Sequence, residues 1–139
     1  MASIFTKILA GELPGHFVWK DDTCFAIMTI QPIRAGHLIV IPNAEINHWD
    51  DMPEATAAHV MNVAQKIAKG MKAVIPSKRV GVTVIGLEVP HAHVHLIPID
   101  SLNDIDFKLA RALPQDELAD TAKSIREALA NLGFQHGAG

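Results

Sequence analysis

Cysteine is almost absent from this chain of 139 residues, in which Cys24 is the only thiol. One cysteine cannot form an internal disulfide, and a metal site built from cysteines cannot be assembled. Tyrosine is missing, and aromatic residues account for only 5% of the chain. Histidine is the exception among the ring-bearing residues, because it occurs eight times. The candidate chemistry of this sequence therefore lies with imidazole.

A basic cluster and a long apolar run are also missing. Lysine and arginine are scattered and the formal net charge is -3, which leaves no basic stripe for nucleic acid. No stretch approaches the roughly 20 apolar residues that cross a bilayer. Lys7, Gly11 and Glu12 interrupt the N-terminal segment, so it does not have the pattern of a secretory signal. We expect a cytoplasmic protein without nucleic-acid or membrane partners.

The apolar pattern predicts one globular domain over residues 1–139, since hydrophobic residues make up 49% and charged residues 19%. Short β-rich runs predict strands at 17–20, 24–30, 37–41, 80–85 and 89–99. Apolar residues at helical spacing predict a short helix capped by Ser3, a helix between Pro53 and Pro76, and one at 115–132. The expected class is α+β, with a mostly antiparallel five-stranded sheet, two main helices and a short flexible tail at 134–139.

The helix between Pro53 and Pro76 carries a broad apolar stripe. Part of this stripe must belong to the core, but it is wide for a helix that covers one side of a small sheet. We therefore expect a homodimer that forms through this helix. The stripe consists of Ala57, Val60, Met61, Ala64, Ile67, Ala68, Met71 and Val74.

Three histidines alternate with apolar residues at 91–95, in the order His91-Ala92-His93-Val94-His95. On a strand, the three imidazoles face one way and the apolar side chains face the core. Three imidazoles on one face are costly unless something binds there, because each ring needs partners for two nitrogens. A functional role is therefore favoured over a purely structural one.

Two functional interpretations remain open from the residues alone. In the first, two of the three histidines share a metal ion with a further ligand, for which His37 and His48 are candidates. In the second, one imidazole attacks phosphorus while its neighbours donate hydrogen bonds to phosphate oxygens or to the leaving atom. Imidazole titrates near neutrality, which suits proton transfer at cellular pH.

At these residues the sequence resembles the histidine-triad (HIT) family of nucleotide hydrolases and transferases. Residues 90–98, Pro-His-Ala-His-Val-His-Leu-Ile-Pro, fit its signature of three histidines alternating with apolar residues. Residues 4–14 are similar to the family's N-terminal segment, and residues 32–42 to its Pro-Gly-His strand. The resemblance covers about residues 4–98.

The resemblance implies a two-layer α+β fold that dimerises, and it implies a role for each histidine. His93 would be the nucleophile and would form a nucleotidyl-histidine that water then hydrolyses. His95 would contact the α-phosphate or the bridging atom, and His91 would orient the triad. His37 would be a fourth histidine at the site.

Several positions depart from the family pattern. Thr29 stands where an aspartate often contacts the ribose, and Glu88 stands where many members have a serine or threonine near the leaving group. Leu87 replaces a common glutamine. Ser3 and Thr6 replace the two cysteines that bind zinc in some relatives, so we expect no structural zinc and no cofactor.

The expected function is hydrolysis of a nucleoside monophosphate derivative, with a phosphoramidate as the expected small-molecule substrate. Thr29, His37 and Glu88 are the expected substrate contacts. The alternatives are a dinucleoside polyphosphate hydrolase and a nucleotide-binding regulatory protein with weak activity.

Overall fold

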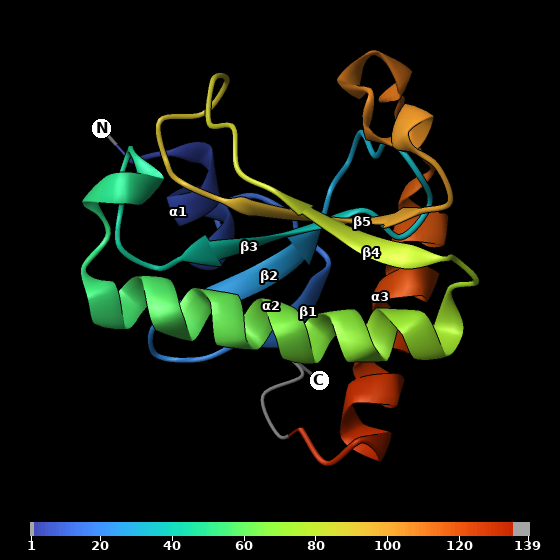
Figure 1. Cartoon of the computed structure of the whole chain (residues 1–139). Coiled ribbons are helices and arrows are strands. Elements are labelled where there is room, and N and C mark those ends of the chain that lie inside the picture. Colours follow the sequence, from blue (N-terminus) through green and yellow to red (C-terminus); the bar gives the residue numbers. More distant parts are fainter. Residues whose placement is uncertain (1, 135–139) are drawn as a thin grey trace.

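The computed structural model describes residues 2–134, which form an antiparallel sheet with helices on both faces (Figure 1). Its five strands run in the order β1-β2-β3-β5-β4, and each neighbouring pair is antiparallel. The predicted α+β class and five-stranded sheet are thereby confirmed. The strands are β1 (Phe17–Lys20), β2 (Cys24–Met28), β3 (Leu38–Pro42), β4 (Arg79–Thr83) and β5 (Val94–Ile99).

Residues 2–134 also form three α-helices and three short 3-10 helices. Both predicted long helices are present, each within a residue or two of its expected ends. The α-helices are α1 (Ile4–Leu9), α2 (Glu54–Val74) and α3 (Gln115–Asn131). The 3-10 helices are η1 (Trp49–Asp51), η2 (Leu102–Ile105) and η3 (Phe107–Leu109), none of which the sequence pattern predicted.

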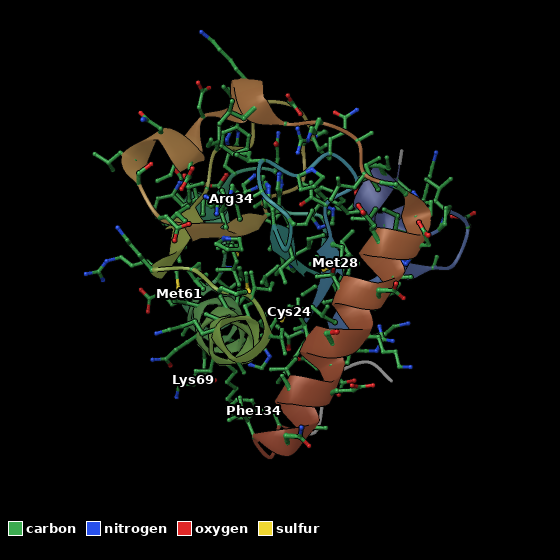
Figure 2. All side chains as sticks on the ribbon, turned by 90° about the vertical axis from the view of Figure 1, so that its right-hand side faces the viewer. Cys24, Met28, Arg34, Met61, Lys69 and Phe134 are labelled. Atoms are coloured by element: carbon green, nitrogen blue, oxygen red, sulfur yellow. The ribbon has the colours of Figure 1, made fainter. Side chains whose placement is uncertain are left out.

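The central strands β2 and β3 are buried on both faces. On one face, Ala26, Val40 and Leu96 pack against α2 and α3. Figure 2 shows α2 almost end-on with α3 running beside it. On the other face, Phe25 and Ile39 pack with Phe5 of α1. The sheet therefore separates a large helix-covered core from a smaller layer around α1.

The buried side of α2 differs in part from the predicted stripe. Val60, Ala64, Ile67 and Met71 are buried as expected, but Met61 is 49% exposed. Residues Val63 and Gly70 complete the buried side instead. The side of α2 that packs against α3 and the sheet therefore does not include Met61, which remains on the surface. In α3, Leu132 was also expected to face inward, but it is the exposed C-cap residue.

The last strand is shorter than predicted, because β5 begins at Val94 rather than at residue 89. Within the preceding segment, the His91 amide donates to the Val89 carbonyl and the Ala92 amide donates to the Ile46 carbonyl. Pro90 has no amide hydrogen to offer a neighbouring strand. His91 and His93 therefore lie in an irregular segment that leads into β5. Two other strands, predicted at 24–30 and 80–85, span Cys24–Met28 and Arg79–Thr83.

Phe134, the first residue of the predicted tail, packs against the core, and its amide donates to the Leu129 carbonyl. The rest of the predicted tail lies outside the described residues. Within residues 2–134, no helix has the length and apolar character needed to span a bilayer.

Candidate active site

Four histidines gather on the α1 face of the sheet, around the start of β5. His95 lies opposite Ile39 of β3, and its ring centroid is 4.9 Å from that of His93. Phe5 of α1 contacts the His93 ring edge-on at 4.9 Å. His37, His91, His93 and His95 are all buried, with exposed fractions between 0% and 8%. The strand alternation therefore predicted the correct face, although two of the residues precede the strand.

A tight turn brings His37 to this face. The His37 amide donates to the Arg34 carbonyl, and Gly36 has a φ of +97°. That conformation favours glycine, and an added Cβ would also collide with Ile75. Gly36 therefore permits the turn that places His37 just before β3.

Hydrogen bonds determine which nitrogen of His95 carries its proton. The Ile33 amide donates to His37 Nδ1 over 3.1 Å, so a neutral His37 carries its proton on Nε2. That Nε2 lies 2.9 Å from His95 Nδ1 and donates to it. The proton of His95 is consequently on Nε2, where it can be donated to a ligand.

His93 has the opposite arrangement. Its Nδ1 lies 2.8 Å from the His91 carbonyl oxygen, and a carbonyl can only accept. His93 therefore donates from Nδ1, and Nε2 of the neutral ring keeps a free lone pair. Of the two cavity-lining imidazoles, His93 offers a basic nitrogen and His95 offers an N–H donor.

His91 is bound on both sides of its ring rather than open to a ligand. Its Nε2 donates to the Pro42 carbonyl over 2.7 Å, so its Nδ1 accepts from the Ser3 hydroxyl at 2.6 Å. The hydroxyl of Thr6 donates to Glu45 over 2.6 Å, and the Ser3 amide also donates to Glu45. Ser3 and Thr6 thus hold His91 and α1 in place. Two hydroxyls already bound in this way do not provide the thiolates of a cysteine-based zinc site.

Burial favours the neutral forms of His37, His93 and His95. Loss of solvation lowers the pKa of His37 to about 4 and that of His95 to about 3, and repulsion from neighbouring imidazoles adds to the effect. Burial also lowers the pKa of His93, whereas the hydrogen bond to the His91 carbonyl and the charge of Glu88 oppose that shift. The tautomers derived above, with a basic Nε2 on His93 and an N–H on Nε2 of His95, are therefore the forms present at neutral pH.

A cavity of about 250 Å³ opens over His93 and His95. Its wall includes the predicted contact Glu88, and it does not include Thr29, His37 or His91. Thr29 nevertheless lies next to the turn that carries His37, because its amide donates to the His37 carbonyl. Its buried hydroxyl has no partner among the described residues. The complete lining is Ile85, Gly86, Leu87, Glu88, His93, His95 and Phe107.

Phe107 is the aromatic residue of the cavity wall, and the sequence did not predict it or the neighbouring Ile85 and Gly86 as site residues. It belongs to η3, and its ring contacts His95 edge-on at 5.0 Å and His37 at 6.3 Å. A three-residue 3-10 helix has no periodic apolar pattern. The only available signal was an isolated aromatic residue in a polar segment.

The geometry does not favour a shared metal ion at these histidines. His37 and His95 face each other through a direct N···N hydrogen bond. His48, the other candidate ligand, is an exposed residue that precedes η1. Among the described residues, no three histidine nitrogens lie within 4.8 Å of one another. The arrangement is instead suited to nucleophilic attack assisted by an N–H donor.

Comparisons with known proteins show which family this chain is similar to. The HIT domain matches residues 10–102. An uncharacterized HIT-like protein of Borreliella burgdorferi is 32% identical over 79% of this chain and 84% of the relative. The purine nucleoside phosphoramidase of Escherichia coli is 32% identical over 68% of this chain and 85% of the relative. A crystal structure of a zinc-bound histidine triad family protein from Mycobacterium smegmatis superposes with a TM-score of 0.83, covers 96% of both chains and is 25% identical.

Proposed function

Because the chain belongs to the HIT family, we propose that it is a nucleotide hydrolase in which His93 attacks the α-phosphate of a nucleoside monophosphate derivative. The observation that carries this proposal is the hydrogen bond from His93 Nδ1 to the His91 carbonyl. It leaves Nε2 as the basic nitrogen of a buried, neutral ring that lines the cavity. The similarity to the phosphoramidase of Escherichia coli supports the same chemical class.

The reaction proceeds in two displacements at one phosphorus atom. In the first, His93 Nε2 forms a bond to phosphorus as the bond to the leaving group breaks, which gives a nucleotidyl-histidine. In the second, water attacks the same phosphorus and the bond to Nε2 breaks. One water is consumed overall: its hydroxyl ends on the phosphate and its proton ends on the leaving group.

The neighbouring residues have supporting roles in this proposal. His95 donates from Nε2 to a phosphate oxygen or to the leaving atom, and His37 fixes that donor through its own bond to His95. His91 positions the carbonyl that holds His93. The unpartnered hydroxyl of Thr29 is the candidate contact for the ribose.

Glu88 is the basis for proposing a phosphoramidate as the substrate. Its carboxylate lines the cavity with His93 and His95 and acts electrostatically on His93. A polyphosphate leaving group is anionic, and two like charges about 4 Å apart cost on the order of 4 kcal/mol at intermediate dielectric. An amine departs neutral or as a cation, and a nearby carboxylate favours its departure.

The nucleophile is tested by comparing His93→Ala with His95→Ala. We expect His93→Ala to lose nearly all turnover and to form no nucleotidyl adduct, because the attacking nitrogen is gone. His95→Ala should retain more adduct formation, which mass spectrometry of the intact protein measures. Equal or greater activity in His93→Ala than in His95→Ala would overturn the assignment. Adduct-free binding of nucleotide by the wild type would indicate a regulatory binding protein instead.

The leaving-group preference is tested separately with Glu88→Ser. The ratio of kcat/KM for an adenylyl amidate over a diadenosine polyphosphate should fall markedly in this variant. Glu12→Ser, which changes an exposed carboxylate outside the cavity wall, is the matched control. An unchanged ratio in Glu88→Ser would reduce Glu88 to a surface residue without affecting the assignment of His93.

A further inference from the structure

A second group of chemically active side chains lies on the helix-covered face of the sheet, away from the four histidines. Asp21 is in the turn between β1 and β2, Cys24 begins β2, and His59 lies near the start of α2. Their ligand atoms all lie within 4.8 Å of one another. Among the described residues this is the only group of three or more histidine, cysteine, aspartate or glutamate side chains that meets this criterion.

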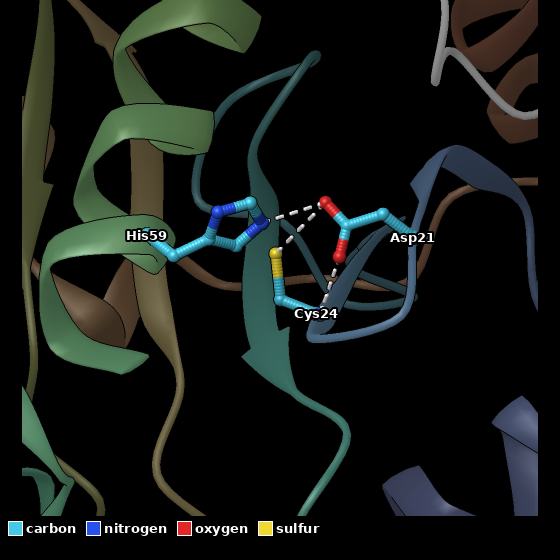
Figure 3. Close-up of side chains that lie close together, drawn as sticks. All are labelled: Asp21, Cys24 and His59. Atoms are coloured by element: carbon cyan, nitrogen blue, oxygen red, sulfur yellow. Dashed lines mark hydrogen bonds and ion pairs between the residues drawn. The ribbon is translucent and has the colours of Figure 1, made fainter. Parts of the chain in front are cut away.

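The three side chains converge on one carboxylate oxygen (Figure 3). His59 Nε2 is 2.8 Å from Asp21 Oδ2, and Cys24 Sγ is 3.9 Å from the same oxygen. An N–H and an S–H are thus directed at a single acceptor. One divalent cation placed between the three atoms would replace both hydrogens.

The surroundings orient the carboxylate as they do in known metal sites, where ligating carboxylates accept further hydrogen bonds. Asp21 Oδ1 accepts from the amides of Thr23 and Cys24, each over 2.8 Å. Trp19 Nε1 donates to Oδ2 over 2.7 Å. These three donors fix the orientation of the Asp21 carboxylate.

Burial and access are also appropriate for an ion. Cys24 is fully buried and the side chain of Asp21 is 8% exposed, whereas that of His59 is 40% exposed. An ion can therefore enter along His59 and keep one position open to water. A single cysteine excludes a metal site made of cysteines alone, but it is sufficient for a mixed site that needs one thiolate.

We propose that Asp21, Cys24 and His59 bind one zinc ion, with water as the fourth ligand. Sulfur, imidazole nitrogen and carboxylate oxygen are the donors that zinc takes, in tetrahedral geometry. Its usual bond lengths place ligand atoms about 3.3–3.6 Å apart. Reaching this spacing requires only small movements, chiefly of the partly exposed His59 ring. Binding releases the thiol proton of Cys24, and the proton that His59 donates from Nε2 to Asp21 moves to Nδ1, so that Nε2 can bind the ion.

Such an ion would join the β1–β2 turn to α2, two segments separated by 38 residues in the sequence. A ligand that binds only the folded state stabilises it by mass action. The proposed zinc site is independent of the reaction proposed at His93, because Asp21, Cys24 and His59 do not line the cavity over His93.

The test uses cobalt as a spectroscopic substitute for zinc in tag-free, chelator-treated protein. Because Cys24 is the only cysteine, a thiolate-to-cobalt charge-transfer band reports this site alone, whatever the other histidines bind. We expect one equivalent of cobalt to produce the band and one equivalent of zinc to abolish it. His95→Gln is the control and should keep the band.

Cys24→Ser should lose the band, but it alters a buried core residue. His59→Gln changes a partly exposed side chain, and it should weaken cobalt binding by at least about 10-fold while the far-ultraviolet circular dichroism stays unchanged. Zinc should raise the Tm of the wild type and not that of His59→Gln. Cobalt binding without a thiolate band, or unchanged affinity in His59→Gln, would overturn the proposal.

Discussion

Ser3 illustrates how one hydroxyl outside the cavity can affect His93, the proposed nucleophile. It donates to His91 Nδ1, and the backbone carbonyl of His91 in turn fixes the proton of His93. We expect Ser3→Ala to lower kcat by roughly 10-fold, about 1.4 kcal/mol in barrier, with little change in KM. The same hydroxyl also accepts from the Thr6 amide as the N-cap of α1, so stability should fall by about 1 kcal/mol.

The two effects of Ser3→Ala can be separated with Ser3→Thr, which retains a hydroxyl. If Ser3 acts by positioning, Ser3→Thr restores kcat as well as Tm. A loss of Tm with normal kcat in Ser3→Ala would limit Ser3 to a helix cap. Steady-state kinetics and thermal unfolding of the three proteins decide between these outcomes.

The buried imidazoles also predict how stability depends on pH. Burial lowers the pKa of His37 to about 4 and that of His95 to about 3, below the unfolded value of 6.5. Between pH 6.5 and about 4 the unfolded chain therefore binds more protons than the folded chain, so stability falls as the pH falls through this range. We expect Tm to decline over this window, as measured by calorimetry.

The matched variant for the pH dependence is His95→Gln, which removes one titrating group and keeps a polar side chain. Its Tm should decline less steeply below pH 6.5 than that of the wild type. Parallel profiles would show that His95 does not carry the dependence.

At the level of single residues, the sequence predicted the histidines because their alternation places chemically identical groups on one face. It could not predict Phe107 or the approach of His59 to Asp21. Those contacts depend on the path of irregular segments and on how α2 crosses the sheet. Neither the path of these segments nor the position of α2 on the sheet follows from the local periodicity of apolar residues. The role of Ser3 was likewise hidden, since its bond to His91 spans 88 residues.

The contact between α2 and α3 depends on Gly70. A Cβ at this position would lie 2.9 Å from Leu129 Cδ2 and 3.6 Å from the Ile125 carbonyl oxygen. Glycine costs about 1 kcal/mol in a helix relative to alanine, so close packing explains its presence. We expect Gly70→Val to destabilise the fold by about 1–3 kcal/mol through overpacking, as measured by urea unfolding.

Ala73→Val is the control for Gly70→Val, because it adds a β-branched side chain at an exposed position of the same helix. Ala73→Val measures the lower helix propensity of valine relative to alanine, whereas Gly70→Val should gain from propensity because glycine ranks below valine. Unchanged or increased stability of Gly70→Val would therefore contradict the packing explanation.

Among the secondary-structure elements, the long helices were predictable because their buried residues recur at three and four positions. The start of β5 was not, since the alternation continues through His91 and His93 although no strand pairs with them. The amide of Ala92 donates instead to Ile46, a residue far away in the sequence. A period of two therefore indicated the face of these side chains but not the hydrogen bonds of their backbone.

For the whole molecule, we propose that the exposed side of α2 and the edge strand β4 bind a second copy of the chain. Met61 and Val82 are 49% and 51% exposed, and both line a hollow between the two elements. Figure 2 places Met61 on the side of α2 away from α3. Sedimentation at micromolar concentration should give twice the chain mass of 15.1 kDa.

Met61→Glu should shift this dimer toward the monomer, because it places a charge in an apolar contact. Lys72→Glu, an exposed change on the same helix, should leave the mass unchanged. A wild-type mass near 15.1 kDa would contradict the dimer.

The hydrogen bonds that define the histidine protons also have a consequence for refolding. They join residues 88, 58 and 49 positions apart, from Ser3 to His91, His37 to His95 and Pro42 to His91. Contacts between such distant residues require closure of long loops, whereas α2 and α3 form from neighbours in the sequence. After dilution from denaturant, helical circular dichroism should therefore recover before catalytic activity does. Recovered activity then measures completed folding more stringently than recovered helix content.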